Sequence, residues 1–171
     1  KPLGIGILSA AAKRGLILES ELKNLVDVMA RLNDCGALLS GLDGVHAMTD
    51  VTGFGLLGHL IEMCEGAGLS AELSLDPLQL IAGAEKYRDQ FVFPDNTYRN
   101  WNAFEKKVSG VNGPEFITLC DPQTSGGLLF AADPSAQKEV EELLKKQGLQ
   151  HHTEPIGRFV EKKEATVLVG R

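Results

Sequence analysis

The chain has 171 residues, of which 43% are hydrophobic and 23% are charged, and its formal net charge is −6. This composition is typical of one globular domain with a buried core, or of one part of a larger two-domain protein, and it excludes a disordered chain. Because the charge is negative and no cluster of lysines and arginines exceeds two or three residues, the sequence excludes an electrostatic surface for nucleic acid or for an anionic membrane. It favours a small-molecule partner.

The three cysteines, Cys35, Cys64 and Cys120, are far apart and form no C-x-x-C pair. They indicate neither a disulfide framework nor a zinc site, so the sequence predicts a reducing, cytoplasmic location. No apolar run approaches the ~20 residues that span a bilayer, and no signal segment opens the chain. The chain begins without Met, directly in an apolar stretch, and we therefore expect that it starts within a longer one.

Five elements are predicted in the first half of the chain. Residues 3–8 form a short apolar run that predicts a strand. Over residues 20–36, which begin with a possible N-cap serine, apolar side chains recur at intervals of three and four and predict an amphipathic helix. A strand over 45–51, a helix over 55–65 and a strand over 71–75 then form a strand, turn, helix, strand unit.

The second half is less regular at first. A helical turn or two is expected over 82–90, followed by a loop at 94–96 and a short helix over 101–108. Strands are predicted over 116–120 and 127–133, because the polar and glycine-containing segment between them interrupts continuous pairing.

An Asp-Pro pair at 133–134 opens the clearest helix of the chain, and Gly148 closes it. The tail, residues 155–169, predicts two strands joined by a charged turn. Together these elements predict an α/β (α+β) domain of two layers, in which a mixed sheet of about five or six strands is covered by helices.

The stretch AMTDVTGFGLLG, residues 47–58, places Gly53, Gly55 and Gly58 at the G-x-G-x-x-G spacing of a dinucleotide-binding turn. Asp76, near the end of the following strand, stands at about the distance expected of a ribose-binding acid. A glycine-rich turn that leads into a helix also presents free backbone N–H groups, which favour an anion. A dinucleotide-binding module is therefore one hypothesis for this segment.

Polar side chains directly before the first glycine favour a second hypothesis. Thr49, Asp50 and Thr52 place a carboxylate and two hydroxyls where a ligand of the turn would lie, and a carboxylate repels a pyrophosphate unless a cation intervenes. Asp50 is therefore interpreted as a ligand of Mg²⁺, which would bridge phosphate oxygens but needs further ligands. The alternative, equally compatible with the spacing, is that Asp50 caps the following helix near Gly53.

The stretch CDPQTSGGLLF, residues 120–130, contains two adjacent glycines, Gly126 and Gly127, before a predicted strand. They indicate a close backbone approach, either to another chain segment or to a ligand. The alternative is an ordinary turn in which Asp121 and Ser125 satisfy nearby backbone groups. This loop and the loop at 47–58 are expected to converge at one edge of the domain.

Three stretches in this order, KPLG at 1–4, MTDVTGFGLLGHL at 48–60 and CDPQTSGGLL at 120–129, resemble the C-terminal half of the selenide, water dikinase (selenophosphate synthetase) family. That family is related to aminoimidazole ribonucleotide (AIR) synthetase, whose relatives pair an N-terminal ATP-handling domain with a C-terminal α/β domain. The resemblance implies that residues 1–171 are the C-terminal domain and that the N-terminal domain is absent. It also implies that the longer protein makes selenophosphate, orthophosphate and AMP from ATP, selenide and water.

The resemblance further implies a set of functional residues. Asp50 matches an aspartate of the family's Mg²⁺ cluster, whereas the catalytic residues lie in the missing half, so we expect the 171 residues alone to be inactive. The wall of the ATP site is expected to include Thr49, Thr52, Gly53, Thr124, Ser125 and Gly126. The implied partners are ATP, selenide, the missing domain and, in a homodimer, a second copy of the longer protein. Another enzyme of the superfamily, a dinucleotide-binding module and a non-catalytic scaffold are the alternatives.

One loop departs from the family pattern. The family's G-G-T-x-R-N motif corresponds to D-N-T-Y-R-N here, so that Thr97, Arg99 and Asn100 are present while Asp95 and Asn96 replace the two glycines. The sequence leaves the role of this loop open.

The histidines and cysteines are expected to have structural roles. For His59, local packing or hydrogen bonding is favoured over a role as an acid or a ligand. His151 and His152 would point apart on a strand, which argues against a metal site. None of the cysteines matches the family's reactive position, and Cys64 and Cys120 are expected to be buried as small apolar residues.

Overall fold

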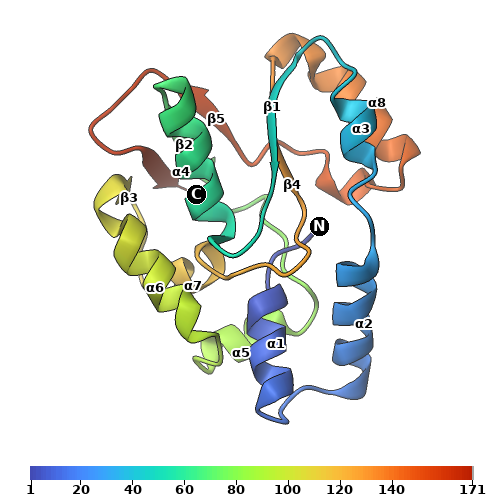
Figure 1. Cartoon of the computed structure of the whole chain (residues 1–171), viewed down its shortest axis with the longest axis vertical. Helices are drawn as coiled ribbons and strands as arrows, with labels where there is room; N and C mark the ends of the chain where they lie inside the picture. Colours follow the sequence, from blue (N-terminus) through green and yellow to red (C-terminus); the bar gives the residue numbers. More distant parts are fainter. Residues whose placement is uncertain (171) are drawn as a thin grey trace.

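The computed structural model describes residues 1–170, and Figure 1 shows helices arranged around a central group of strands. The α-helices of this part of the chain are α1 (Ile5–Lys13), α2 (Glu19–Ala30), α3 (Cys35–Leu39), α4 (Gly55–Ala67), α5 (Ala84–Asp89), α6 (Asp95–Phe104), α7 (Glu115–Leu119) and α8 (Gln137–Lys146). The strands are β1 (Val45–Asp50), β2 (Ser70–Ser74), β3 (Val108–Ser109), β4 (Leu128–Ala132), β5 (Gly157–Val160) and β6 (Val167–Gly170). Short 3₁₀ helices are η1 (Glu105–Lys107), η2 (Pro134–Ala136) and η3 (Gln150–His152).

The strands are divided between two sheets. β1 and β4 pair antiparallel, and Asp50, at the end of β1, lies opposite Leu128. The other sheet has the order β3-β6-β2-β5, in which β5 is antiparallel to β2, while β2, β6 and β3 are parallel. The predicted mixed α/β fold is confirmed, but one sheet was expected where there are two. β4 and β5 are edge strands of different sheets, and both line the same cavity.

Three apolar clusters connect the elements. In the first, α4 packs against the four-stranded sheet through contacts such as those of Leu57 and Val167, and this cluster includes Val51 and Cys120. The second joins α1, α2 and α5, which gather at the lower end of Figure 1. The third packs α3 and α8 against the β1–β4 pair. Because Val51 and Cys120 belong to the first cluster, both motif loops start from the packed core.

Residues 3–8 begin a helix, and the predicted strand is wrong. Gly4 has a φ of 106°, in the left-handed region that favours glycine, and α1 starts directly after it. Ile5 and Ile7, which lie on nearly opposite faces of the helix, are both fully buried. α1 is therefore enclosed on several sides, and a short apolar run of this kind cannot be told from a buried strand by its periodicity.

The predicted strand at 116–120 is also wrong, because these residues lie in or directly after α7. Pro114 precedes this helix and Glu115 lies in its first turn, both of which are signals of a helix start that the apolar composition of the segment outweighed. The predicted loop at 94–96 likewise opens a helix, since Pro94 is the N-cap of α6.

Most of the other predicted strands and helices are confirmed within one to a few residues. Two helices differ more: the helix expected over 20–36 ends at Ala30 and is followed by the separate α3, and the helix expected over 101–108 is the end of α6, which starts at Asp95. α2 differs in one respect from an ordinary amphipathic helix. Its Leu25 is buried, with 3% of its surface exposed, whereas Leu22 and Val26 are 41% and 53% exposed. Among the described residues, no helix combines the length and the apolar character needed to cross a membrane.

Candidate functional site

Asp50 ends β1 with an exposed side chain. Within the described residues its carboxylate has neither a hydrogen bond nor an ion pair, and the neighbouring Thr49 hydroxyl donates to the backbone carbonyl of Asp50 at 3.3 Å. In the part of the chain that the structure describes, no side chain caps the following helix, α4. The alternative in which Asp50 caps that helix is therefore wrong, and its carboxylate is accessible to a ligand.

His59 fixes the turn that follows Asp50. Its Nε2 accepts hydrogen bonds from the Thr52 backbone N–H, at 3.0 Å, and from the Thr52 hydroxyl, at 3.1 Å. A neutral imidazole that accepts at Nε2 carries its proton on Nδ1, and this atom lies 3.0 Å from Glu62 Oε2. The predicted local role of His59 is confirmed, and the Thr52 hydroxyl is directed toward the histidine.

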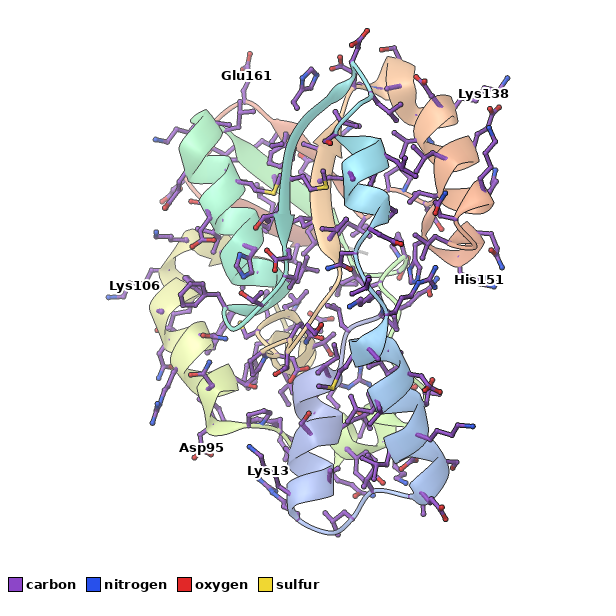
Figure 2. The ribbon with its side chains drawn as sticks, turned by 45° about the vertical axis from the view of Figure 1, so that its right-hand side comes forward. Lys13, Asp95, Lys106, Lys138, His151 and Glu161 are labelled. Atoms are coloured by element: carbon purple, nitrogen blue, oxygen red, sulfur yellow. The ribbon has the colours of Figure 1, made fainter. Side chains whose placement is uncertain are left out.

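Asn100 connects the same turn to the second motif loop. Its side chain is buried, and Nδ2 donates to the Gly53 carbonyl at 2.8 Å and to the Cys120 carbonyl at 3.0 Å. Asn96 donates to the Gly53 carbonyl as well, at 3.2 Å. The loop that departs from the family pattern thus forms the start of α6, where Figure 2 labels Asp95, and it orients both motif loops.

The glycine spacing of the first motif is explained by packing. A Cβ atom on Gly55, whose φ is +70°, would lie 2.8 Å from the backbone carbon of Cys120, and one on Gly58 would lie 2.7 Å from the ring of Phe104. Gly53 has open space around its Cα. Moreover, β1 and β2 belong to different sheets, so the parallel strand pair of a dinucleotide-binding unit is not formed by these elements.

The two motif loops converge, as predicted. The Val51 N–H donates to the Gly127 carbonyl at 2.8 Å, and the Gln123 N–H donates to the Thr52 carbonyl at 2.9 Å. A Cβ atom on Gly126 would lie 2.1 Å from the Val51 carbonyl oxygen. The close approach that the adjacent glycines indicated is therefore made to another chain segment.

The exposed part of the second loop consists of Thr124 and Ser125. Ser125 has a φ of 56°, which is uncommon for a residue other than glycine. Its hydroxyl donates to the Met29 carbonyl at 2.9 Å, while its own carbonyl accepts from Lys1 Nζ at 2.7 Å. These contacts hold the loop against α2 and against the first residue of the chain.

Asp121 has a role that the sequence did not reveal. It is fully buried, and its Oδ2 accepts from the Gly6 N–H, at 2.9 Å, and from Gln123 Nε2, at 2.7 Å, while Oδ1 has no hydrogen-bond partner within residues 1–170. Burial raises the pKa of this carboxyl to about 7. Asp121 therefore accepts a hydrogen bond from the first turn of α1, 115 residues away along the chain. The expectation that Asp121 satisfies only nearby backbone groups is wrong.

The cysteines are structural, as expected. All three are buried. Burial raises the pKa of the Cys64 thiol to about 11 and that of the Cys120 thiol to about 12. A reactive thiol needs a lowered pKa and access to solvent, so neither cysteine has the environment of a nucleophile.

The residues at the end of β1 fit one part of a Mg²⁺ site. Asp50 offers an accessible carboxylate, which is the hard oxygen ligand that this ion prefers. Within residues 1–170, however, no group of three or more His, Cys, Asp or Glu side chains could hold a metal ion. A Mg²⁺ ion bound here would therefore need ligands from outside the described residues.

One known protein family matches the chain over all of its described residues. Residues 1–170 fit the family model described as AIR synthase related protein, C-terminal domain. The chain belongs to this family. The selenide, water dikinase of Haemophilus influenzae (strain 86-028NP) is 41% identical over 169 residues, which are 99% of this chain and 48% of that relative. The enzyme of the same name from Cronobacter sakazakii (strain ATCC BAA-894) is 44% identical over 149 residues, which are 87% and 43% of the two chains.

The chain thus spans about half the length of the curated relatives it matches. Solved structures share the fold. E. coli HypE, a hydrogenase maturation protein, has a TM-score of 0.68 at 20% identity, over 99% of this chain and 44% of that one. Thiamine-monophosphate kinase from Stenotrophomonas maltophilia K279a has a TM-score of 0.63 at 19% identity, over 98% and 47% of the two chains. These likenesses support the fold alone, and they agree with the expected AIR synthetase-like C-terminal domain.

Proposed function

We propose that the chain is the C-terminal domain of a selenide, water dikinase, which makes selenophosphate, orthophosphate and AMP from ATP, selenide and water. Relatives that carry this name at 41% and 44% identity support the proposal, as does the order of the motifs. Because the chain spans about half of those relatives, the proposal includes an N-terminal ATP-handling domain in the same longer protein. A homodimer in the cytoplasm is the proposed setting.

The observation that carries the proposal is the exposed carboxylate of Asp50 at the end of a strand, which has no partner among residues 1–170. We infer that Asp50 supplies one ligand of the Mg²⁺ ions that accompany ATP, the other ligands coming from the N-terminal domain. When bound, Mg²⁺ would supply positive charge that stabilises the negative charge of the phosphate groups. The proposed wall of the site consists of Thr49, Thr52, Gly53, Thr124, Ser125 and Gly126.

The turn after Asp50 is suited to this role because it is held from two directions. His59 binds the Thr52 backbone N–H, and Asn100 binds the Gly53 carbonyl. A carboxylate on a fixed turn needs little reorganisation when its ligand binds. Such preorganisation is the general requirement of an electrostatic site. The chain's own contribution is thus to position Asp50.

Phosphorus NMR of the full-length protein with ATP, Mg²⁺ and selenide under anaerobic conditions tests the proposal. We expect a selenophosphate resonance in the wild type and none in Asp50→Asn. The matched control is Asp76→Asn, which changes another exposed aspartate that follows a strand end and should leave the resonance in place. Absence of selenophosphate from the wild type, with turnover of a ribotide substrate, would assign the protein to another reaction of the superfamily.

The 171 residues alone are expected to form no AMP, because one carboxylate cannot assemble the site. Incubation of this segment with ATP, Mg²⁺ and selenide, followed by chromatography of the nucleotides, checks this expectation. If this segment alone formed AMP in the presence of selenide, the proposal that the N-terminal domain supplies the other ligands of the site would be contradicted.

A further inference from the structure

A large cavity lies away from the exposed side of the motif loops. Its volume is about 890 Å³, and it is bounded by β4 and α8 on one side and by α4 and β5 on the other. Of the stretches at 47–58 and 120–130 it touches the apolar residues and one glycine, Ala47, Val51, Leu56, Gly127, Leu128, Leu129 and Phe130, and it does not touch Asp50 or Ser125. This volume is in the range of small-molecule pockets in proteins, which is about 300–1,000 Å³.

The middle of the cavity is mostly apolar. Half-buried or buried side chains that line it are those of Leu78, Leu129, Leu149, Ile156 and Phe159. β4 and β5 also border it with sheet edges that pair with no further strand of the described chain. A ligand with an apolar part of moderate size could therefore pack against the walls of the cavity. A few unpaired backbone groups of the two strand edges would also be available to it.

Two cationic side chains and two imidazoles lie at one end of the cavity. They are those of Lys1, Arg31, His151 and His152. The Lys1 ammonium and the Arg31 guanidinium are near enough to interact electrostatically, and His152 is near enough to interact with both Arg31 and His151. Burial, and then the neighbouring positive charges, lower the pKa of His152 to about 4, so that its ring is neutral near pH 7. The positive charge at this end is therefore that of Lys1 and Arg31, and no carboxylate of the described chain pairs with either of them.

The protein groups that these cations contact are neutral. Lys1 Nζ donates to the Ser125 carbonyl at 2.7 Å, and an Arg31 guanidinium nitrogen donates to the Gln147 carbonyl at 3.0 Å. The His152 ring has no hydrogen bond or ion pair within residues 1–170. The carboxylates that line the cavity are those of Asp34, Asp133 and Glu154. None of them forms an ion pair with Lys1, Arg31 or either histidine in the described chain, and Asp133 instead pairs with His46 at 3.0 Å.

We propose that this cavity binds a small organic anion, with its phosphate or carboxylate group at Lys1, Arg31 and His152 and its apolar or aromatic body along the wall that includes Leu78 and Ile156. The ligand would supply the negative charge that the protein does not place there, and hydrogen bonds to charged groups are among the stronger ones. Because Lys1 also holds the Ser125 carbonyl, an occupied cavity would stabilise the motif loop from behind. This inference does not rest on the proposed dikinase activity.

Fluorescence anisotropy of 1-naphthyl phosphate, titrated with the purified full-length protein in the absence of Mg²⁺ and ATP, tests the proposal. We expect saturable binding that weakens about tenfold in Arg31→Gln, the loss expected for one charge-assisted contact. Neutral 1-naphthol should bind at least about tenfold more weakly than the phosphate. Leu78→Trp, which fills the cavity, should abolish binding, and Arg31→Lys should retain part of it.

Two control variants test where the probe binds. Lys138→Gln also removes one positive charge, but from α8, and Figure 2 shows Lys138 at the opposite end of this helix from His151. The affinity of this variant for the probe should equal that of the wild type. Asp50→Asn should also bind the probe normally. Equal affinity of the wild type and Arg31→Gln, or no saturable binding at about 1 mM, would overturn the inference. So would binding that is lost in Asp50→Asn but kept in Arg31→Gln, since it would belong to the site at the end of β1.

Discussion

Asp50 and Asp121 mark the two motif loops, and their carboxylates are in opposite environments. Asp121 is fully buried and accepts hydrogen bonds from Gly6 and Gln123. Asp50 is exposed and has no side-chain partner in the described chain. A buried carboxylate with protein donors serves the fold, whereas an exposed one on a fixed turn is available to a ligand. The same residue type thus has two different roles in two loops that are joined by the hydrogen bond from Val51 to Gly127.

The largest expected effect is the loss of activity on substitution of Asp50, and it distinguishes a ligand-binding carboxylate from a structural one. Asp50→Asn in the full-length protein should lower the rate of selenophosphate formation by about two orders of magnitude, because a preorganised charge is lost. The free energy of unfolding should change by less than about 0.5 kcal/mol, because the side chain is exposed. Steady-state kinetics and urea denaturation of the same preparation check both parts. A large loss of stability in this variant would make Asp50 a structural residue like Asp121.

The pH dependence of stability should report Asp121. Its pKa is about 7 in the folded protein and its ordinary value is 3.8, so the protonated carboxyl stabilises the fold fully below pH 3.8. This contribution is lost as the pH rises toward 7, at about 1.4 kcal/mol per unit of pKa shift.

Asp121→Asn lacks this titration. The free energy of unfolding of the variant minus that of the wild type should therefore rise between about pH 4 and pH 7 and stay level above pH 7. Urea denaturation at a series of pH values measures the difference. A difference that is independent of pH would show that Asp121 stays ionised in the folded state.

Glycine variants sharpen the comparison between the loops. Gly126→Ala should lower the free energy of unfolding by about 2–3 kcal/mol, because its Cβ would lie 2.1 Å from the Val51 carbonyl oxygen. Gly53→Ala is the matched control, since nothing lies within 4 Å of its Cβ position, and it should change stability by less than about 0.5 kcal/mol. Thermal and urea unfolding would contradict this account if the two variants were equally stable.

Asn100→Ala is expected to have the smallest effect on stability that is still measurable. It removes two hydrogen bonds, to Gly53 and Cys120, and should cost about 1–2 kcal/mol. Activity should fall more than in Asn102→Ala, an exposed neighbour on the same helix, because the turn that positions Asp50 loses one support. Equal activity of the two variants would show that Asn100 does not position the site.

Much of this arrangement can be predicted from the sequence, where the signal is local. The alternation over 45–51 and the glycines after it predict β1, α4 and the position of Asp50 at the end of the strand. Contacts over long separations leave no local signal. The pairing of Asp121 with Gly6 spans 115 residues and that of Asn100 with Gly53 spans 47.

The two strands that were predicted wrongly have a common physical cause. The segments at 3–8 and 116–120 are short and apolar, and each is buried as a helix against neighbours that the sequence does not specify. In such segments burial, rather than periodicity, decides which residues are apolar. The division of the strands into two sheets escaped prediction for a similar reason, because it depends on which strand edges meet.

The most direct test of the central claim, that Asp50 is a metal ligand of the nucleotide site, is a titration of bound Mn²⁺ by electron paramagnetic resonance. Mn²⁺ replaces Mg²⁺ as a hard, oxygen-preferring ion, and the full-length protein is titrated in the presence of ATP as wild type and as Asp50→Asn. We predict that the variant binds fewer Mn²⁺ ions, or binds one of them at least about tenfold more weakly. The same number and affinity of Mn²⁺ ions in both proteins would contradict the claim.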